Sequence, residues 1–149
     1  MTNTRITDAE VFERRYPVIL REFSIRKGSG GIGAHRGGDG VIRDIEFRIP
    51  VQVSILSERR VYHPYGMDGG GEAKCGLNLW IRGKEQRPIN LGGKNTAAMK
   101  PGERIIVHTP GGGGYGEPDE ERKVKNIQDP KHAWRGGSLA TRLSTQETN

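Results

Sequence analysis

The residues whose types and spacing could do chemistry begin with a glycine-rich run at residues 28–40, GSGGIGAHRGGDG. Residues 28–33 match the G-x-G-x-x-G pattern that binds a dinucleotide pyrophosphate. That chemistry needs a helix that begins inside the loop, and three further glycines after Arg36 oppose one. A nest of backbone N–H groups that binds an anion needs no helix and remains open. We favour a third interpretation, a structural loop that joins two strands.

A second glycine-rich run, PGGGGYG, occupies residues 110–116. It lacks the Lys-Ser or Lys-Thr pair of a phosphate-binding P-loop. It follows a segment whose apolar alternation ends at Val107, so we predict the exit of a strand at which backbone segments pack closely. Tyr115 would cover apolar surface there.

Arg59 and Arg60 lie at the end of another predicted strand and offer neighbouring guanidinium groups. A guanidinium can bind a carboxylate or a phosphate through two parallel hydrogen bonds. The same side chains could instead form surface ion pairs with Glu58 or Asp68, which contribute little to stability. Both interpretations remain open.

Metal and nucleophile chemistry have weaker support. No zinc-ligand spacing links the four histidines, which are His35, His63, His108 and His132. We therefore predict no metal site within this chain. The single cysteine, Cys75, has no base beside it in the sequence and is expected to fill space in the core. No catalytic constellation is visible among these residues.

Composition limits the class of protein. The length of 149 residues suits one domain, and the net charge of +6 permits an anionic partner, although ordinary solvated surface is the simpler explanation. No basic run reaches five residues and no aromatic residues alternate with basic ones, so nucleic-acid binding is poorly supported. No apolar stretch approaches the ~18 residues of a membrane span, and no secretory signal is visible. We expect a cytoplasmic protein without a nucleic-acid or membrane partner.

The elements that must position these residues are mostly strands. Thr7 followed by Glu10 fits a capping box and predicts a helix over 8–15, which ends before Pro17. Apolar and polar residues then alternate in five segments, 18–26, 41–49, 51–56, 75–82 and 103–109. Short half-buried strands separated by turns indicate a mainly β fold. We predict an antiparallel β-sandwich or distorted barrel with a short N-terminal helix and Gly-rich loops.

The alternation also predicts which side chains share a face of a strand. Phe23 and Ile25 share the apolar face of the first strand, and Arg26 lies on its polar face. Asp44 belongs to the polar face of the second strand. In the last strand, His108 is expected to face outward, opposite the apolar side chains.

Composition changes towards the C-terminus. Residues 1–116 carry the whole positive excess, whereas residues 117–149 hold six acidic and six basic residues and few apolar ones. We predict one domain over 1–116 and a charged, largely flexible tail over 117–149. Within this tail, 117–135 fits a linker and 138–146 a short helix capped by Ser138.

Five strings follow one another between Thr2 and Gly116: TNTRITDAE, REFSIRKGSGGIGAHRGGDGVIRDIEF, VSILSERRVYHPYGMDGG, NLGGKN and TPGGGGYG. In this order they resemble the C-terminal part of the hydantoinase B family, and most of all its ATP-dependent 5-oxoprolinases. A looser similarity continues in WRGGSLATR at 134–142. The order and length of the strings make the resemblance specific.

The resemblance implies a hydrolase chemistry, the ATP-driven opening of the 5-oxo-L-proline lactam to L-glutamate in the glutathione cycle. In this family the hydantoinase A portion binds ATP, and the N-terminal half of the B portion holds the metal ligands. Both portions are missing from this sequence. We therefore expect a C-terminal fragment that binds no cofactor itself and is inactive alone.

The implied partner is the remainder of an oxoprolinase, whose full-length form uses ATP and a divalent metal and is expected to be a homo-oligomer. Two alternatives stay open. One is a non-catalytic assembly module that completes a partner's active site. The other is a non-functional remnant of a longer gene.

The resemblance implies that residues from three motifs lie near the parent enzyme's substrate site: Asn3, Thr4 and Arg5 from TNTR, Arg36 and Asp39 from RGGDG, and Arg59 from SERR, a motif that Arg60 also matches. We expect Asn3 and Arg36 to orient groups or stabilise an oxyanion in the parent active site. The equally weighted alternative is that Arg36 and Asp39 only fix their loop through hydrogen bonds.

Overall fold

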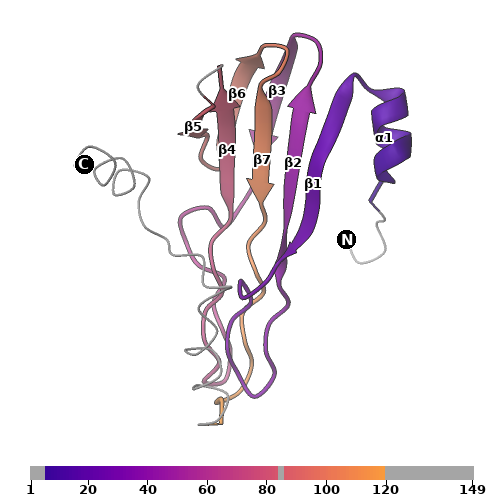
Figure 1. Ribbon diagram of the computed structural model, residues 1–149. Helices are drawn as coiled ribbons and strands as arrows, with labels where there is room; N and C mark the ends of the chain where they lie inside the picture. The colour runs from indigo at the N-terminus through magenta and orange to yellow at the C-terminus, as the bar shows by residue number, and fades with distance from the viewer. Residues whose placement is uncertain (1–5, 84–85, 120–149) are drawn as a thin grey trace, which may run out of the picture.

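The computed structural model describes residues 6–83 and 86–119 (Figure 1). They form one short helix, α1 (Ala9–Arg15), and a set of strands: β1 (Val18–Arg26), β2 (Gly40–Phe47), β3 (Val51–Leu56), β4 (Leu77–Arg82), β5 (Arg87–Asn90), β6 (Lys94–Met99) and β7 (Arg104–His108). The helix is too short to cross a bilayer, and the described residues contain no other. The predicted helix 138–146 and most of the predicted linker lie outside the described residues.

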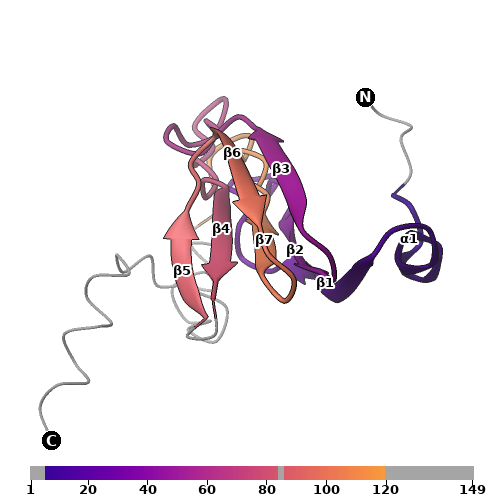
Figure 2. The ribbon, with the colours of Figure 1, turned by 90° about the horizontal axis from the view of Figure 1, so that it is seen from above.

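The strands form two antiparallel sheets. Five of them pair in the order β1-β2-β7-β4-β5, and β3 pairs with β6 in a second sheet. The second sheet lies on one side of the first (Figure 2), and the described strands close no barrel. The core between the sheets contains Val18, Phe47, Leu91, Ala97, Met99 and Ile105. The prediction of a mainly β, sandwich-like fold is therefore confirmed.

The helix begins one residue later than predicted. Its N-cap is Asp8 rather than Thr7, because the Asp8 carboxylate accepts the backbone N–H of Glu10 at 3.0 Å. After Pro17 the chain reverses into β1, where the Glu13 carboxylate accepts the backbone N–H of Leu20 at 2.6 Å. The bond from Leu20 to Glu13 attaches the helix to β1, at the edge of the larger sheet.

All five predicted strands are confirmed within a few residues at their ends, but two further strands were not predicted. β5 is short and contains Pro88, and β6 has the sequence KNTAAM, which lacks apolar alternation. β6 exists because it pairs along its whole length with β3 and buries Ala97 and Met99. Tertiary pairing, not local preference, determines this strand.

β1 and β2 form where the alternation predicts strands, but the side chains that they bury are not the predicted ones. Phe23 and Ile25 are 48% and 64% exposed, whereas Arg26 and Asp44 are buried. A β-bulge between Leu20 and Glu22 shifts the register, and the second half of β1 runs beyond the β3–β6 pair (Figure 1). Because no second layer covers it among the described residues, the apolar side chains there remain exposed.

The two buried charges on these strands have partners. The guanidinium of Arg26 donates from Nη1 to the carbonyl oxygens of Cys75 and Thr109, at 2.7 and 2.9 Å. The Asp44 carboxylate accepts a hydrogen bond from Arg104 at 2.7 Å. Because they have these partners, the two charged side chains can occupy buried positions in the strands. The sequence pattern did not predict this burial.

Three loop segments, 28–39, 64–74 and 110–116, run together from one end of the sheet (Figure 1), and we call them the glycine bundle. They contain no helix or regular strand but exchange backbone hydrogen bonds. Examples are Gly31 N–H to Gly112 O at 2.8 Å, Gly71 N–H to Ile32 O at 2.6 Å and Gly114 N–H to Gly71 O at 2.9 Å. Both glycine runs are thus structural loops whose backbones pack closely, as predicted.

Candidate functional site

Asp39 occupies the nest of backbone N–H groups at the start of the first glycine run. Its Oδ1 accepts the backbone N–H groups of Ser29 and Gly30, each at 2.9 Å, and Nη2 of Arg36 at 2.6 Å. The nest that could have bound an external anion therefore holds a carboxylate of the chain itself. Arg36 and Asp39 lie together as an ion pair that fixes the loop.

The surroundings of Asp39 favour its charged form. Burial alone would raise the pKa of this carboxyl group, but the hydrogen bonds from Arg36, Gly30 and Ser29 outweigh burial and hold the pKa below its usual value. A group with a lowered folded-state pKa stabilises the fold above its unfolded pKa, which is about 3.9 for Asp. This contribution is lost as the pH falls through the folded-state pKa.

Asp39→Asn should therefore destabilise the chain in a pH-dependent way. Near neutral pH we expect a loss of about 2 kcal/mol, the usual contribution of hydrogen bonds to a charged group. As the pH falls through the lowered folded-state pKa of Asp39, the wild-type carboxylate itself becomes protonated, so the difference between the two proteins should shrink. Urea unfolding over a descending pH series from neutral pH measures it, with the exposed Glu58→Gln as control. A difference that stays equal over the whole series would contradict the assignment.

The neighbouring arginines Arg59 and Arg60 have different surroundings. Arg60 turns inward, where Nη1 donates to the backbone oxygen of Glu58 at 2.6 Å and Nη2 to Oδ1 of Asn78 at 3.1 Å. Burial lowers the pKa of its guanidinium. Arg59 makes a longer hydrogen bond of 3.4 Å to the carbonyl oxygen of His63. Neither arginine forms an ion pair with Glu58 or Asp68, so that interpretation is wrong for the described residues.

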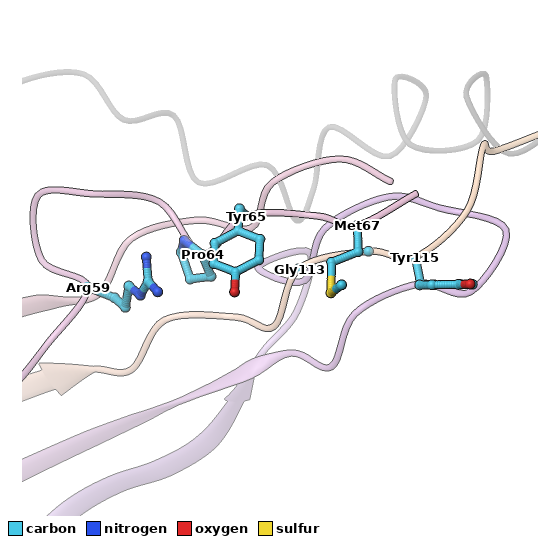
Figure 3. Close-up of a pocket in the computed structure, with 7 residues that line it drawn as sticks. Arg59, Pro64, Tyr65, Met67, Gly113 and Tyr115 are labelled. Carbon is cyan, nitrogen blue, oxygen red and sulfur yellow. The ribbon is translucent and has the colours of Figure 1, made fainter. Parts of the chain in front are cut away.

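Arg59 lines a surface cavity of about 350 Å³ at the glycine bundle (Figure 3). The other walls are Pro64, Tyr65, Met67 and Tyr115, with the backbone of Gly113 and Gly114. The Arg59 guanidinium lies over the Tyr65 ring, 5.5 Å from its centre. This arrangement offers one cation beside apolar and aromatic walls.

The structure does not bring all predicted site residues to this cavity. Arg36 and Asp39 are absent from its walls, and Asn3, Thr4 and Arg5 lie outside the described residues. Tyr65 and Met67 were missed as candidates because the sequence shows only a turn-rich stretch there. These side chains are 66% and 60% exposed, and their place on the cavity wall becomes visible only in the folded structure.

The described residues gather no group of three His, Cys, Asp or Glu side chains that could hold a metal ion. His63 contacts the carbonyl oxygen of Ala73 through Nδ1 at 2.7 Å. His108 is half-buried rather than directed outward, and burial lowers its pKa. Burial and then the neighbouring Glu72 raise the pKa of the Cys75 thiol, which therefore has little thiolate character.

Comparisons with known proteins identify relatives. A family model described as hydantoinase B/oxoprolinase matches residues 1–118. The 5-oxoprolinase of Saccharomyces cerevisiae is 61% identical over 108 residues, covering 72% of this chain and 8% of that protein. 5-Oxoprolinase 1 of Arabidopsis thaliana is 58% identical over 116 residues, covering 78% of this chain and 9% of that protein.

A solved structure is also similar. The crystal structure of the ATP-dependent caprolactamase from Pseudomonas jessenii matches with a TM-score of 0.68 and 25% sequence identity, covering 82% of this chain and 22% of that chain. The chain spans between 8 and 12% of the length of the first three curated relatives it matches.

Proposed function

The chain belongs to the hydantoinase B/oxoprolinase family, and from this premise we propose that it is the C-terminal segment of an ATP-dependent 5-oxoprolinase. Such an enzyme opens the lactam of 5-oxo-L-proline to L-glutamate. The observation that carries the proposal is the identity of 58–61% to 5-oxoprolinases over 72–78% of this chain. The similar caprolactamase is also named for an ATP-dependent activity on a cyclic amide.

The reaction needs activation of a stable bond. An unactivated amide is a poor electrophile, and phosphorylation of its oxygen creates a good leaving group. The described residues do not fit ATP or a divalent metal: Asp39 fills the backbone nest, and no cluster of three potential metal ligands forms among them. We assign both groups to the remainder of the parent enzyme, so that this segment alone is inactive.

In this proposal, residues of this segment help to bind the substrate and to position the groups around it. We assign Asn3, Thr4 and Arg5 to the vicinity of the parent's substrate site, together with Arg36 and Arg59. The hydrogen bonds of Asp39 support a different role for that residue, which is to hold the loop and the Arg36 guanidinium in place. Asp39 is thus a positioning residue in this proposal.

The proposal includes a cellular setting. Conversion of 5-oxo-L-proline to L-glutamate belongs to glutathione metabolism, and we place it in the cytoplasm, because a chain with one cysteine requires no oxidising compartment for an internal disulfide. The partner is the remainder of the oxoprolinase, within a homo-oligomeric enzyme.

A chimera tests the proposal. Residues of this chain replace the aligned segment of the Saccharomyces cerevisiae 5-oxoprolinase, and ADP release is measured with and without 5-oxo-L-proline. We expect substrate-dependent ADP release within about tenfold of the unmodified relative, because the two segments are 61% identical. A chimera that folds but releases no ADP would refute the proposal.

The same assay separates the alternative of an assembly module. In that case the separate chain, added to the relative lacking this segment, would restore ADP release in trans. Restoration only by covalent fusion identifies an integral segment of the enzyme.

A further inference from the structure

The partners of the Arg59 guanidinium leave most of its N–H groups available at the wall of the cavity. Arg21, Arg36 and Arg104 each form an ion pair with a carboxylate. Arg26 and Arg60 donate to carbonyl oxygens inside the protein. Arg59 has no carboxylate partner among the described residues, and it donates one hydrogen bond there, to the carbonyl oxygen of His63 at 3.4 Å. Arg82 also lacks a carboxylate partner among these residues, but it does not line the cavity. The remaining N–H groups of Arg59 can therefore receive an anionic ligand.

The backbone at Arg59 has an uncommon conformation. Its φ is +58°, in the left-handed region that residues with a Cβ seldom adopt. At this point of the chain the Arg60 side chain reaches the buried Asn78, whereas the Arg59 side chain lines the cavity. Strain of this kind persists where the surrounding structure enforces it, and it often accompanies ligand sites.

The walls indicate what kind of anion fits. Tyr65, Met67 and Tyr115 supply flat or flexible apolar surface, and Arg59 is the single cationic side chain among the wall residues (Figure 3). A nucleotide or another polyphosphate carries several negative charges and favours a site with several cations, whereas these walls offer one. A volume of about 350 Å³ falls within the range of small-molecule sites.

We propose that this cavity binds a single carboxylate carried by a compact ring, and that Arg59 holds the carboxylate of 5-oxo-L-proline while Tyr65 and Met67 contact the ring. This inference rests on the proposed function. Arg59 is then the residue that distinguishes 5-oxo-L-proline from lactams without a carboxylate. Tyr65 is a positioning residue, because its ring holds the guanidinium across the cavity.

Binding to the 149-residue chain gives the first test. Heteronuclear NMR titration with 5-oxo-L-proline should shift signals of residues 59–67 and Tyr115, with a Kd on the order of 1 mM. Titration with 2-pyrrolidone, which has the same ring and no carboxylate, should produce at least tenfold weaker binding. Equal binding of the two lactams, or no saturable shift of these residues by 5-oxo-L-proline, would overturn the proposal.

Matched variants locate the effect. Arg59→Gln removes the charge and should abolish the preference for 5-oxo-L-proline over 2-pyrrolidone, whereas Arg59→Lys should retain part of it. Arg82→Gln is the control, because Arg82 also lies over an aromatic ring, that of Trp80 at 5.1 Å, but outside the cavity. Unchanged melting temperatures show that the variants fold. A preference that survives in Arg59→Gln would assign the carboxylate to another group.

The chimera separates failure of this inference from failure of the proposed function. If the wild-type chimera is active, Arg59→Gln should lower kcat/KM for 5-oxo-L-proline by about 10- to 100-fold, the usual effect of losing a hydrogen bond to a charged group. Arg82→Gln should leave it unchanged. An active chimera that is insensitive to Arg59→Gln refutes the inference alone, whereas an inactive wild-type chimera refutes the proposed function.

Discussion

Gly37→Ala should disrupt the glycine bundle, whereas the same substitution at the adjacent Gly38 should leave the chain folded. A Cβ at Gly37 would fall on the carbonyl oxygen of Gly112, whereas a Cβ at Gly38 would have no atom within 4 Å. The obstacle at Gly37 is backbone held on both sides by hydrogen bonds, including Gly31 N–H to Gly112 O and Gly112 N–H to Gly38 O. It cannot rotate away as a side chain would.

The expected loss for Gly37→Ala is about 3 kcal/mol or more, because overpacking adds to broken backbone hydrogen bonds. In a domain of this size, such a loss lowers the melting temperature by about 15 °C. Thermal unfolding followed by circular dichroism measures it. Gly38→Ala should change stability by less than about 1 kcal/mol. Similar shifts in both variants would mean that the loops do not pack as described.

A second pair repeats the comparison on the other glycine run. A Cβ at Gly113 would meet the carbonyl oxygen of Tyr65, whereas the nearest atom to a Cβ at Gly112 is Gly38 N at 3.5 Å, an ordinary contact. Gly113→Ala should therefore reproduce the loss and Gly112→Ala should not. Agreement between the pairs excludes a general intolerance of alanine in these loops.

Asn78→Leu should be about as damaging as the bundle substitution. The Asn78 side chain is almost completely buried at 1% exposure, and it forms three hydrogen bonds: Nδ2 donates to Ser57 Oγ at 2.9 Å and Gly92 O at 2.8 Å, and Oδ1 accepts from Arg60. Leucine has a similar volume but replaces none of the three hydrogen bonds that Asn78 makes to these partners. Each costs about 1–3 kcal/mol, so we expect a loss of at least about 3 kcal/mol.

The loss can be measured by thermal unfolding, with Asn90→Ala as the matched control. Asn90 is exposed and accepts one hydrogen bond, from the backbone N–H of Gly92 at 2.8 Å. Its removal should cost about 1 kcal/mol or less. If Asn78→Leu is as stable as the wild-type chain, the buried hydrogen-bond network around Asn78 is not as described.

The sequence predicted what depends on local pattern. Alternation in segments such as 51–56 and 103–109 identified strands, because a strand with one buried face repeats every two residues. The glycine runs were recognised as structural loops, because an exposed turn does not need so many residues without a Cβ. Family resemblance, rather than periodicity, supplied the proposed chemistry.

What could not be predicted depends on partners distant in the sequence. Gly37 and Gly38 are the same residue in the same run, yet only Gly37 faces a carbonyl group of another segment. The sequence also gives no means of telling Arg59 from Arg60. In the structure Arg59 lines the cavity, whereas Arg60 binds the buried Asn78. The prediction of which β1 side chains are buried was wrong for the same reason, because the extent of the second sheet decides which side chains it covers.

The glycine bundle also has a consequence for the order in which the protein forms. Its first and last segments are placed side by side by the pairing of β2 with β7, and Thr109 N–H donates to Val41 O just beyond that pairing. Closing such long loops costs chain entropy that only the completed sheet offsets. The N–H groups of Gly31, Ala34 and His35 donate to carbonyl oxygens of residues 112–116. During synthesis on the ribosome these groups therefore stay hydrated until residues 110–116 have emerged, and the bundle assembles after the sheet.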